Sequence, residues 1–256
     1  MPMPLEDFAT VYNTHPSWIK KMNSFIPINE NRAKADIIEV GRLAYERHYI
    51  SGTEGNISIR LDSERILTTP RGVCKGRLSP SDLVVTNLDG ELTAESLNQC
   101  HKPSTELKMH LTAYRLRSDV RAIVHAHPTT AVAYTEAGRG LGEPILPESI
   151  LALGDVPITP YATPSTDEVS KSIEAAVLKS NCLIMDHHGS ITMGATVFDA
   201  YYLLETLEHH AKTLLTAHIL GGAKSLTASQ IKTLFDICHV YGIKPPATAT
   251  KWANNE

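Results

Sequence analysis

A short apolar segment that ends in two histidines, Ile123–Pro128, constrains most strongly how this chain can fold. Its β-branched residues favour a buried strand, and His125 and His127 lie two positions apart at the strand end. Side chains two apart in a strand point to the same face, so we expect both imidazoles to project together. Such a pair is half of a metal site, although two buried core histidines are the alternative interpretation.

A second apolar segment, Cys182–Met185, repeats this arrangement, because two histidines and a glycine, His187–Gly189, follow it closely. Neighbouring residues of a strand face opposite sides, so at most one of these two histidines should join the first pair. The glycine lets the backbone turn away directly afterwards. Three imidazoles leave one position of a tetrahedral metal open, which is typical of catalytic sites. With this second segment, a metal site becomes the favoured interpretation.

A carboxylate lies near a predicted helix start at Ser104. Glu106 occupies the first turn, where an acid commonly stabilises the helix dipole; it could instead be a general base or a displaceable metal ligand. Ser104 and Thr105 offer hydroxyl and free N–H groups, which stabilise anions at a helix start. Two loop segments, Gly55–Asn56 and Arg71–Gly72, offer further donors suited to a phosphate. Together these groups predict a phosphorylated substrate beside a divalent metal.

Helical and strand periodicities are mixed along the chain without a strict strand–helix–strand rhythm. Helices are expected at 31–48, 104–117, 129–137, 165–179, 198–220 and 227–241. Capping boxes at Ser165 and Thr227 should open two of them. Strands are expected at 57–61, 66–69, 83–88, 120–127, 182–185 and 190–193. This mixture predicts an α/β fold, a single-domain sandwich with helices flanking a central, mostly antiparallel sheet.

The composition excludes several classes of partner. The net charge is −4 with acids and bases interspersed, so neither nucleic acid nor a membrane surface is expected to bind. No apolar run approaches the roughly 18 residues of a membrane span, and the N-terminus lacks the pattern of a secretory signal. The four cysteines are scattered without a C-x-x-C motif, which favours a cytoplasmic location.

Residues 1–31 differ from the rest, because prolines and scattered aromatic residues give no clear period. We expect this N-terminal arm to pack on a neighbouring subunit, with docking to a larger assembly as the alternative. Residues 32–256 should form one catalytic domain.

Six segments resemble, in order, motifs of the class II aldolase/adducin superfamily, most closely its L-fuculose-1-phosphate aldolases. They are Gly52–Arg60, Thr69–Gly72, Lys102–Glu106 with Met109–His110, Val124–His127, Pro160–Thr163 and His187–Gly189. The resemblance covers roughly residues 35–245. It implies a mostly antiparallel sheet flanked by helices and a C4 homotetramer with active sites at subunit interfaces.

The resemblance also implies roles for individual residues. It places one zinc ion per subunit on His125, His127 and His188, with Glu106 as a further ligand and general acid/base. The implied phosphate pocket consists of Thr53, Gly55, Asn56, Arg71, Gly72, Ser104 and Thr105. Tyr241 resembles a C-terminal tyrosine that reaches the neighbouring site, and Glu148 falls where the fuculose enzymes carry a tyrosine acid.

These expectations predict a zinc-dependent aldolase that cleaves a ketose 1-phosphate to dihydroxyacetone phosphate and an aldehyde through a metal-stabilised enediolate. Fuculose 1-phosphate or a 5-deoxy or methylthio pentulose 1-phosphate is the expected substrate. Glu148 leaves three related activities open, because a carboxyl group there could move other protons. They are a pentulose-phosphate 4-epimerase, a methylthioribulose-phosphate dehydratase and a sugar-acid phosphate decarboxylase. An adducin-like scaffold is the non-enzymatic alternative, against which the histidines and Glu106 argue.

Overall fold

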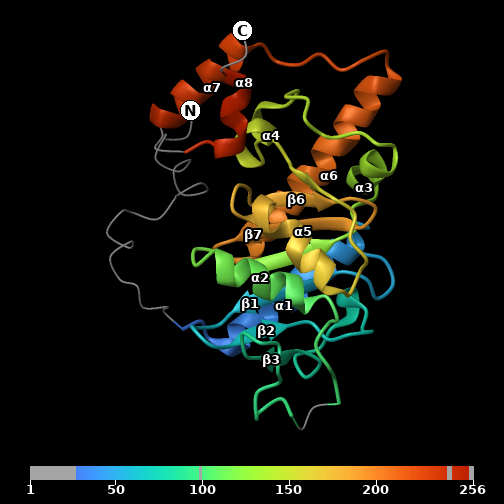
Figure 1. Ribbon diagram of the computed structural model, residues 1–256, viewed down its shortest axis with the longest axis vertical. Coiled ribbons are helices and arrows are strands. Elements are labelled where there is room, and N and C mark those ends of the chain that lie inside the picture. The colour runs from blue at the N-terminus through green and yellow to red at the C-terminus, as the bar shows by residue number, and fades with distance from the viewer. Residues whose placement is uncertain (1–26, 98–99, 241–243, 254–256) are drawn as a thin grey trace, which may run out of the picture.

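A seven-stranded sheet forms the centre of the fold in the computed structural model, which describes residues 27–97, 100–240 and 244–253 (Figure 1). Its order is β3-β2-β1-β4-β7-β6-β5. The strands are β1 (Asn56–Arg60), β2 (Ile66–Thr68), β3 (Val84–Thr86), β4 (Ala122–Ala126), β5 (Ile158–Thr159), β6 (Cys182–Met185) and β7 (Gly189–Gly194). All neighbouring pairs are antiparallel except β5 and β6. The predicted α/β fold with a mostly antiparallel sheet is confirmed.

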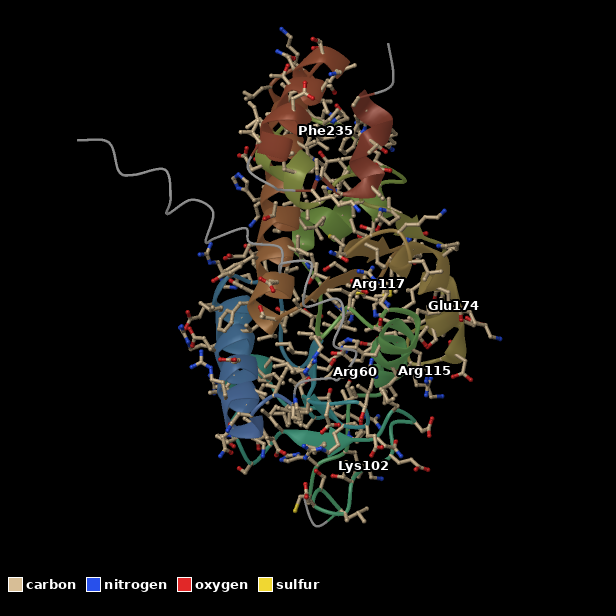
Figure 2. The ribbon with its side chains drawn as sticks, turned by 90° about the vertical axis from the view of Figure 1, so that its left-hand side faces the viewer. Arg60, Lys102, Arg115, Arg117, Glu174 and Phe235 are labelled. Carbon is tan, nitrogen blue, oxygen red and sulfur yellow. The ribbon has the colours of Figure 1, made fainter. Side chains whose placement is uncertain are left out.

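Helices cover both faces of this sheet. They are α1 (Glu30–Glu46), α2 (Leu107–Leu116), α3 (Thr129–Glu136), α4 (Pro147–Ala152), α5 (Asp167–Val177), α6 (Val197–Ile219), α7 (Ala228–Val240) and α8 (Thr250–Ala253), with short 3-10 helices η3 (Lys75–Arg77) and η4 (Ala247–Ala249). In Figure 2, α1 and α6 lie on one side of the sheet, and α2 and α5 lie on the other. Two apolar layers therefore enclose the strands.

The alternation of side chains along β4 decides where the histidines point. Ala122, Val124 and Ala126 pack in the layer under α1 and α6, whereas Ile123 packs in the layer under α2 and α5. Because strand residues two apart share a face, His125 points with Ile123 toward the side of α2. The start of α2 carries Glu106, so the strand pattern brings this acid and the histidines to one side of the sheet.

Of the two predicted capping boxes, the one at Ser165 is wrong and the one at Thr227 is confirmed. The side chain of Thr166, rather than Ser165, caps α5, because its Oγ1 accepts a hydrogen bond from the N–H of Glu168 at 3.3 Å. The reciprocal bonds predicted between Thr227 and Gln230 are present at 2.9 and 3.2 Å. The short elements β5, α4 and α8 were not predicted, since they are too brief to show a period.

The C-terminal helices form a separate apolar cluster at the end of the molecule where α4 lies (Figure 1). Ile150 of α4, Ile231 of α7 and Ala249 of η4 are its buried members, and Phe235, labelled in Figure 2, packs against them. None of the helices in the described residues combines the length and apolar character that a membrane span requires. Nearly all of the predicted arm, residues 1–26, lies outside the described residues.

Candidate metal centre and active site

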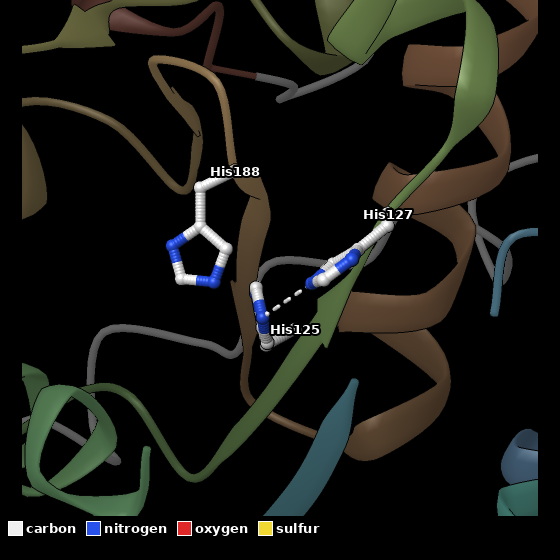
Figure 3. Close-up of side chains that lie close together, drawn as sticks. All are labelled: His125, His127 and His188. Atoms are coloured by element: carbon white, nitrogen blue, oxygen red, sulfur yellow. Dashed lines mark hydrogen bonds between the residues drawn. The ribbon is translucent and has the colours of Figure 1, made fainter. Parts of the chain in front are cut away.

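Three imidazoles meet where the ends of β4 and β7 lie side by side (Figure 3). His125 lies in β4, His127 follows its last residue, and His188 directly precedes β7. Ala126 pairs with Ser190 across the two strands, which brings His188 opposite the first pair. One nitrogen from each ring lies within 4.8 Å of the others. The structure thus selects His188, which the strand pattern alone had left open.

His187 turns away from this cluster. Its φ of 54° lies in the left-handed region, and its Nδ1 contacts Asp186 Oδ1 at 2.9 Å. Tyr161 meets its ring edge-on at 6.5 Å between centroids. The local turn therefore separates the two neighbouring histidines.

Hydrogen bonds on the outer side of two rings orient their inner nitrogens toward the centre. His125 Nδ1 donates to the Ser190 carbonyl at 2.9 Å, and His127 Nδ1 lies 3.1 Å from the carboxylate Oε2 of Glu54. Because these partners are acceptors, each Nδ1 carries the hydrogen and each Nε2 is left with a lone pair. Histidine ligands of metals are commonly fixed in this way.

The spacing of the inner nitrogens fits a bound cation. The Nε2 atoms of His125 and His127 are only 3.0 Å apart, so two lone pairs face one another. Tetrahedral nitrogen ligands of zinc lie roughly 3.4 Å apart, which is close to this distance. Burial, together with the neighbouring rings of His125 and His188, lowers the pKa of His127 to about 3, so a proton is poorly held there. A divalent metal would satisfy these lone pairs, and the residues present therefore fit one.

Glu106 reaches the centre from the start of α2. Its Oε1 lies 2.9 Å from His188 Nε2, and its Oε2 lies 3.2 Å from His125 Nε2. Burial alone would raise the pKa of Glu106, but the neighbouring imidazoles of His125 and His188 hold it well below its usual range. The carboxylate thus contacts the same nitrogens that would bind a metal, which suits a displaceable ligand or an acid/base group.

The predicted phosphate-binding residues lie in three loops, and two of these residues, Asn56 and Ser104, contact Glu106. Asn56 is buried, and its Nδ2 donates to Glu106 Oε2 at 3.3 Å, while its Oδ1 has no hydrogen-bond partner among the described residues. Gly55 has a φ of +68°, and a Cβ there would lie 2.8 Å from the His125 carbonyl oxygen. The loop before β1 therefore packs directly on the strand that carries the histidines.

The other two loops are joined to each other and to the helix start. The N–H of Arg71 donates to the Lys102 carbonyl at 2.9 Å. Ser104 Oγ accepts from the N–H of Glu106 at 3.3 Å, and Thr105 Oγ1 lies 2.9 Å from Ser165 Oγ. Thr53, Arg71 and Gly72 are exposed, so their polar groups are accessible to a ligand.

The assignments of two predicted catalytic residues, Glu148 and Tyr241, are not tested by the described residues. Glu148 lies exposed in the first turn of α4, and no interaction between it and the histidines or Glu106 is found among the described residues. Tyr241 lies outside the described residues. Their assignment rests on the resemblance and stays a prediction.

Sequence reasoning missed two side chains that the structure places at the centre. Glu54 lies within a motif that was recognised, but strand spacing does not show that its carboxylate meets His127. Lys75 was noted only as part of a basic loop, yet it is 2% exposed and donates to the Thr53 carbonyl at 2.6 Å. Only the tertiary packing of the loops reveals both contacts.

Comparison with known proteins agrees with this geometry. A family model described as "Class II Aldolase and Adducin N-terminal domain" matches residues 35–215. The chain belongs to this family. Members of the class II aldolase family are metal-dependent, and the relatives are named as aldolases and decarboxylases, so the chain is a lyase-type enzyme. The predicted superfamily and the predicted lyase are both confirmed.

The relatives of this class II aldolase family member fall into two groups by name, decarboxylases and aldolases. A 3-oxo-tetronate 4-phosphate decarboxylase of Haemophilus influenzae is 32% identical over 77% of this chain and 93% of its own length. An L-fuculose phosphate aldolase of Methanococcus vannielii is 31% identical over 69% of this chain and 92% of its own length. The decarboxylase alternative is thus matched better than the fuculose aldolase that was predicted first.

Solved structures give the same picture. L-fuculose-1-phosphate aldolase from Thermus thermophilus is 30% identical with a TM-score of 0.66, covering 77% of this chain and 100% of that chain. YgbL from Klebsiella pneumoniae is 28% identical with a TM-score of 0.72, covering 81% and 99%. The fold of the catalytic core is therefore shared with both.

Proposed function

We propose that this enzyme is a metal-dependent decarboxylase that acts on 3-oxo-tetronate 4-phosphate or a closely similar sugar-acid phosphate. Relatives of that name match the chain over most of both lengths. The observation that carries the proposal is the position of Glu106, whose carboxylate touches two of the three histidine nitrogens and is bonded to Asn56 of the phosphate loop. One acid/base group thus lies between the metal-binding side and the phosphate-binding side of the site.

The chemistry of such a substrate needs few groups. Its carboxylate is attached to carbon 2, beside the ketone at carbon 3, so breaking the bond between carbons 1 and 2 releases CO2. The electron pair of that bond passes to carbon 2 and gives an enediolate. Protonation of carbon 2 then gives dihydroxyacetone phosphate. Glu106 would deliver this proton from one carboxylate oxygen and take another from water.

The residues of the chain divide the remaining work. A divalent metal held by His125, His127 and His188 would act as a Lewis acid that stabilises negative charge on the substrate oxygens. We propose zinc, because imidazole nitrogens in tetrahedral spacing suit it. The predicted phosphate pocket would hold the other end of the substrate and fix carbon 2 near Glu106. Its members are Thr53, Gly55, Asn56, Arg71, Gly72, Ser104 and Thr105.

The aldolase remains a second candidate, because relatives named L-fuculose phosphate aldolase match the chain almost as well. Cleavage between carbons 3 and 4 of a ketose 1-phosphate leaves the same enediolate of dihydroxyacetone phosphate. It also needs a group that carries the proton of the aldehyde half. Glu148 makes no contact with the histidines or Glu106 among the described residues, so the structure assigns this proton to no side chain. Decarboxylation needs no such group, which favours it.

A homotetramer with active sites between subunits, a cytoplasmic location and no binding to nucleic acid or membranes complete the proposal. An arm formed by residues 1–31 would contact a neighbouring subunit. Light scattering of the purified protein measures the assembly, and a monomer that retains full activity would contradict interfacial sites.

Product analysis tests the proposed reaction. We expect zinc-loaded protein to release CO2 and dihydroxyacetone phosphate in equal amounts from 3-oxo-tetronate 4-phosphate. A chelator should abolish the reaction, and added zinc should restore it, since the histidines and the metal form the site together. L-fuculose 1-phosphate in a parallel assay discriminates the second candidate through release of lactaldehyde. Unchanged turnover after complete removal of the metal would refute both.

A further inference from the structure

Lys75 is a buried ammonium group beside the active site, and no step of the proposed reaction requires it. Its side chain is 2% exposed, and among the described residues its Nζ makes one hydrogen bond, to the carbonyl oxygen of Thr53 at 2.6 Å. An ammonium group has three donors, so a single partner leaves it incompletely satisfied. Buried lysines are rare unless paired, which asks for an explanation beyond packing.

The backbone at Lys75 is held firmly in place. A Cβ on Gly41 of α1 would lie 2.5 Å from the Lys75 carbonyl oxygen, so α1 and η3 are in direct backbone contact. A Cβ on Gly76 would lie 2.5 Å from the ring of Tyr45, again in α1. The glycines at both positions permit this close approach. The ammonium group thus extends from a fixed base to the loop before β1.

The loop that Lys75 contacts includes both Glu54, which contacts a histidine of the metal centre, and residues proposed to bind the phosphate. The Lys75 contact is at Thr53, and its neighbour Glu54 contacts the outer nitrogen of His127. Gly52 and Gly55 have φ values of +54° and +68°, so the loop holds a conformation that glycine alone adopts easily. The residues at 53, 55 and 56 are three of the seven proposed to bind the phosphate. The hydrogen bond from Lys75 to the Thr53 carbonyl therefore restrains the middle of the phosphate loop.

Charge gives the ammonium group a second effect. Burial lowers the pKa of Lys75 to about 8, while the nearby carboxylates of Glu106 and Glu54 act in the opposite direction. Holding this charge away from water is unfavourable to the fold, and such costs are commonly retained where they serve function.

We propose that Lys75 is a positioning residue that holds the Gly52–Asn56 loop in its phosphate-binding shape and places positive charge behind it. The ligand class is an organic phosphate, so the inference rests on the proposed function in its choice of substrate. Lys75 acts through the loop and the field of its charge, because its own surface is buried. A phosphate dianion bound at this loop would be attracted by that charge.

The test compares Lys75→Met with Arg77→Met in zinc-loaded protein. Methionine keeps the length and apolar body of the lysine and removes its charge and its hydrogen bond. Arg77 lies in the same 3-10 helix and is exposed, so R77M removes the same charge without the contact. We expect K75M to raise KM for the phosphorylated substrate about tenfold or more, with a much smaller change in kcat and unchanged zinc content. R77M should match the wild type.

Two further measurements separate this role from a merely structural one. K75M should melt at the wild-type temperature or higher, because it removes a buried charge; a lysine that only stabilised the fold would give a lower melting temperature and an unchanged KM. The dissociation constant of inorganic phosphate, followed by ³¹P NMR of the zinc-loaded protein, should rise about tenfold in K75M. This readout holds even if the proposed reaction is wrong.

The possible outcomes are distinct. Wild-type protein that binds phosphate without turnover, with binding weakened in K75M, would support the inference while the proposed function fails. Equal phosphate affinity and equal KM in K75M and the wild type would overturn the inference whatever the reaction. If K75M does not fold, Lys75→Gln takes its place with the same expected changes, and a wild-type KM in K75Q would overturn the inference.

Discussion

Replacement of Glu106 by glutamine should lower kcat about 10²- to 10⁴-fold, the range typical of a lost general acid or base. Glutamine has nearly the same shape and can still contact Asn56, but it cannot carry the proton to carbon 2. The three histidines remain, so zinc should stay bound. Steady-state kinetics of E106Q, together with its zinc content by elemental analysis, measures both quantities.

An exposed acid supplies the matched control for this variant. Glu174, labelled in Figure 2, lies on the exposed side of α5. The variant E174Q makes the same chemical change and should keep wild-type kinetics. A zinc-loaded E106Q enzyme with wild-type kcat would contradict the role given to Glu106. Loss of zinc together with activity would make Glu106 a required metal ligand instead.

Replacement of Gly189 by alanine should remove the metal site without changing any ligand. A Cβ at this position would lie 2.6 Å from the carbonyl oxygen of Ala126 and 2.6 Å from Cδ2 of His127. It would also lie 2.9 Å from Cε1 of His125. The first atom belongs to the backbone of the paired strand, and the other two belong to rings held by hydrogen bonds, so none can move freely. The methyl group must therefore displace two ligands.

The expected loss is large, because disturbing a partner of a single metal ligand already costs about 10- to 100-fold in affinity. We expect zinc affinity of G189A to fall at least 100-fold, with activity lost in parallel. Overpacking should also lower the free energy of unfolding by about 1–3 kcal/mol. Competition with a chromophoric chelator measures the affinity, and chemical denaturation measures the stability.

Gly140 provides the control glycine. Its nearest neighbour for an added Cβ is Ile158 Cδ1 at 3.7 Å, an ordinary van der Waals distance, and its φ is not in the left-handed region. The variant G140A should bind zinc as the wild type does. Wild-type zinc affinity in G189A would contradict the prediction, because it would mean that the added methyl group fits without displacing His125 and His127.

The sequence predicted the parts of the centre that follow from local periodicity. The two-residue period of a strand placed His125 and His127 on one face, and the antiparallel pairing of β4 with β7 then brought a second strand end to them. The same reasoning could not choose between His187 and His188, because the choice depends on a turn in which His187 takes a positive φ. The structure resolves it through that turn.

Contacts between loops far apart in the chain could not be predicted. Glu54 meets His127, and Lys75 meets Thr53, only because α1, η3 and the loop before β1 pack together. The periodic spacing of hydrophobic residues in the sequence carries no information about such polar contacts. The capping of α5 was misplaced by one residue for a related reason, since Ser165 and Thr166 both suit a cap and the local backbone decides.

Both candidate reactions require this centre to form the enediolate of dihydroxyacetone phosphate. The most direct test is proton exchange in D2O, followed by ¹H NMR of dihydroxyacetone phosphate with zinc-loaded protein. We predict that a hydrogen on the hydroxymethyl carbon is exchanged for deuterium, and that exchange stops after chelation and in E106Q. Absence of exchange in the zinc-loaded wild type, or equal exchange after complete removal of the metal, would contradict metal-dependent enediolate formation at this centre.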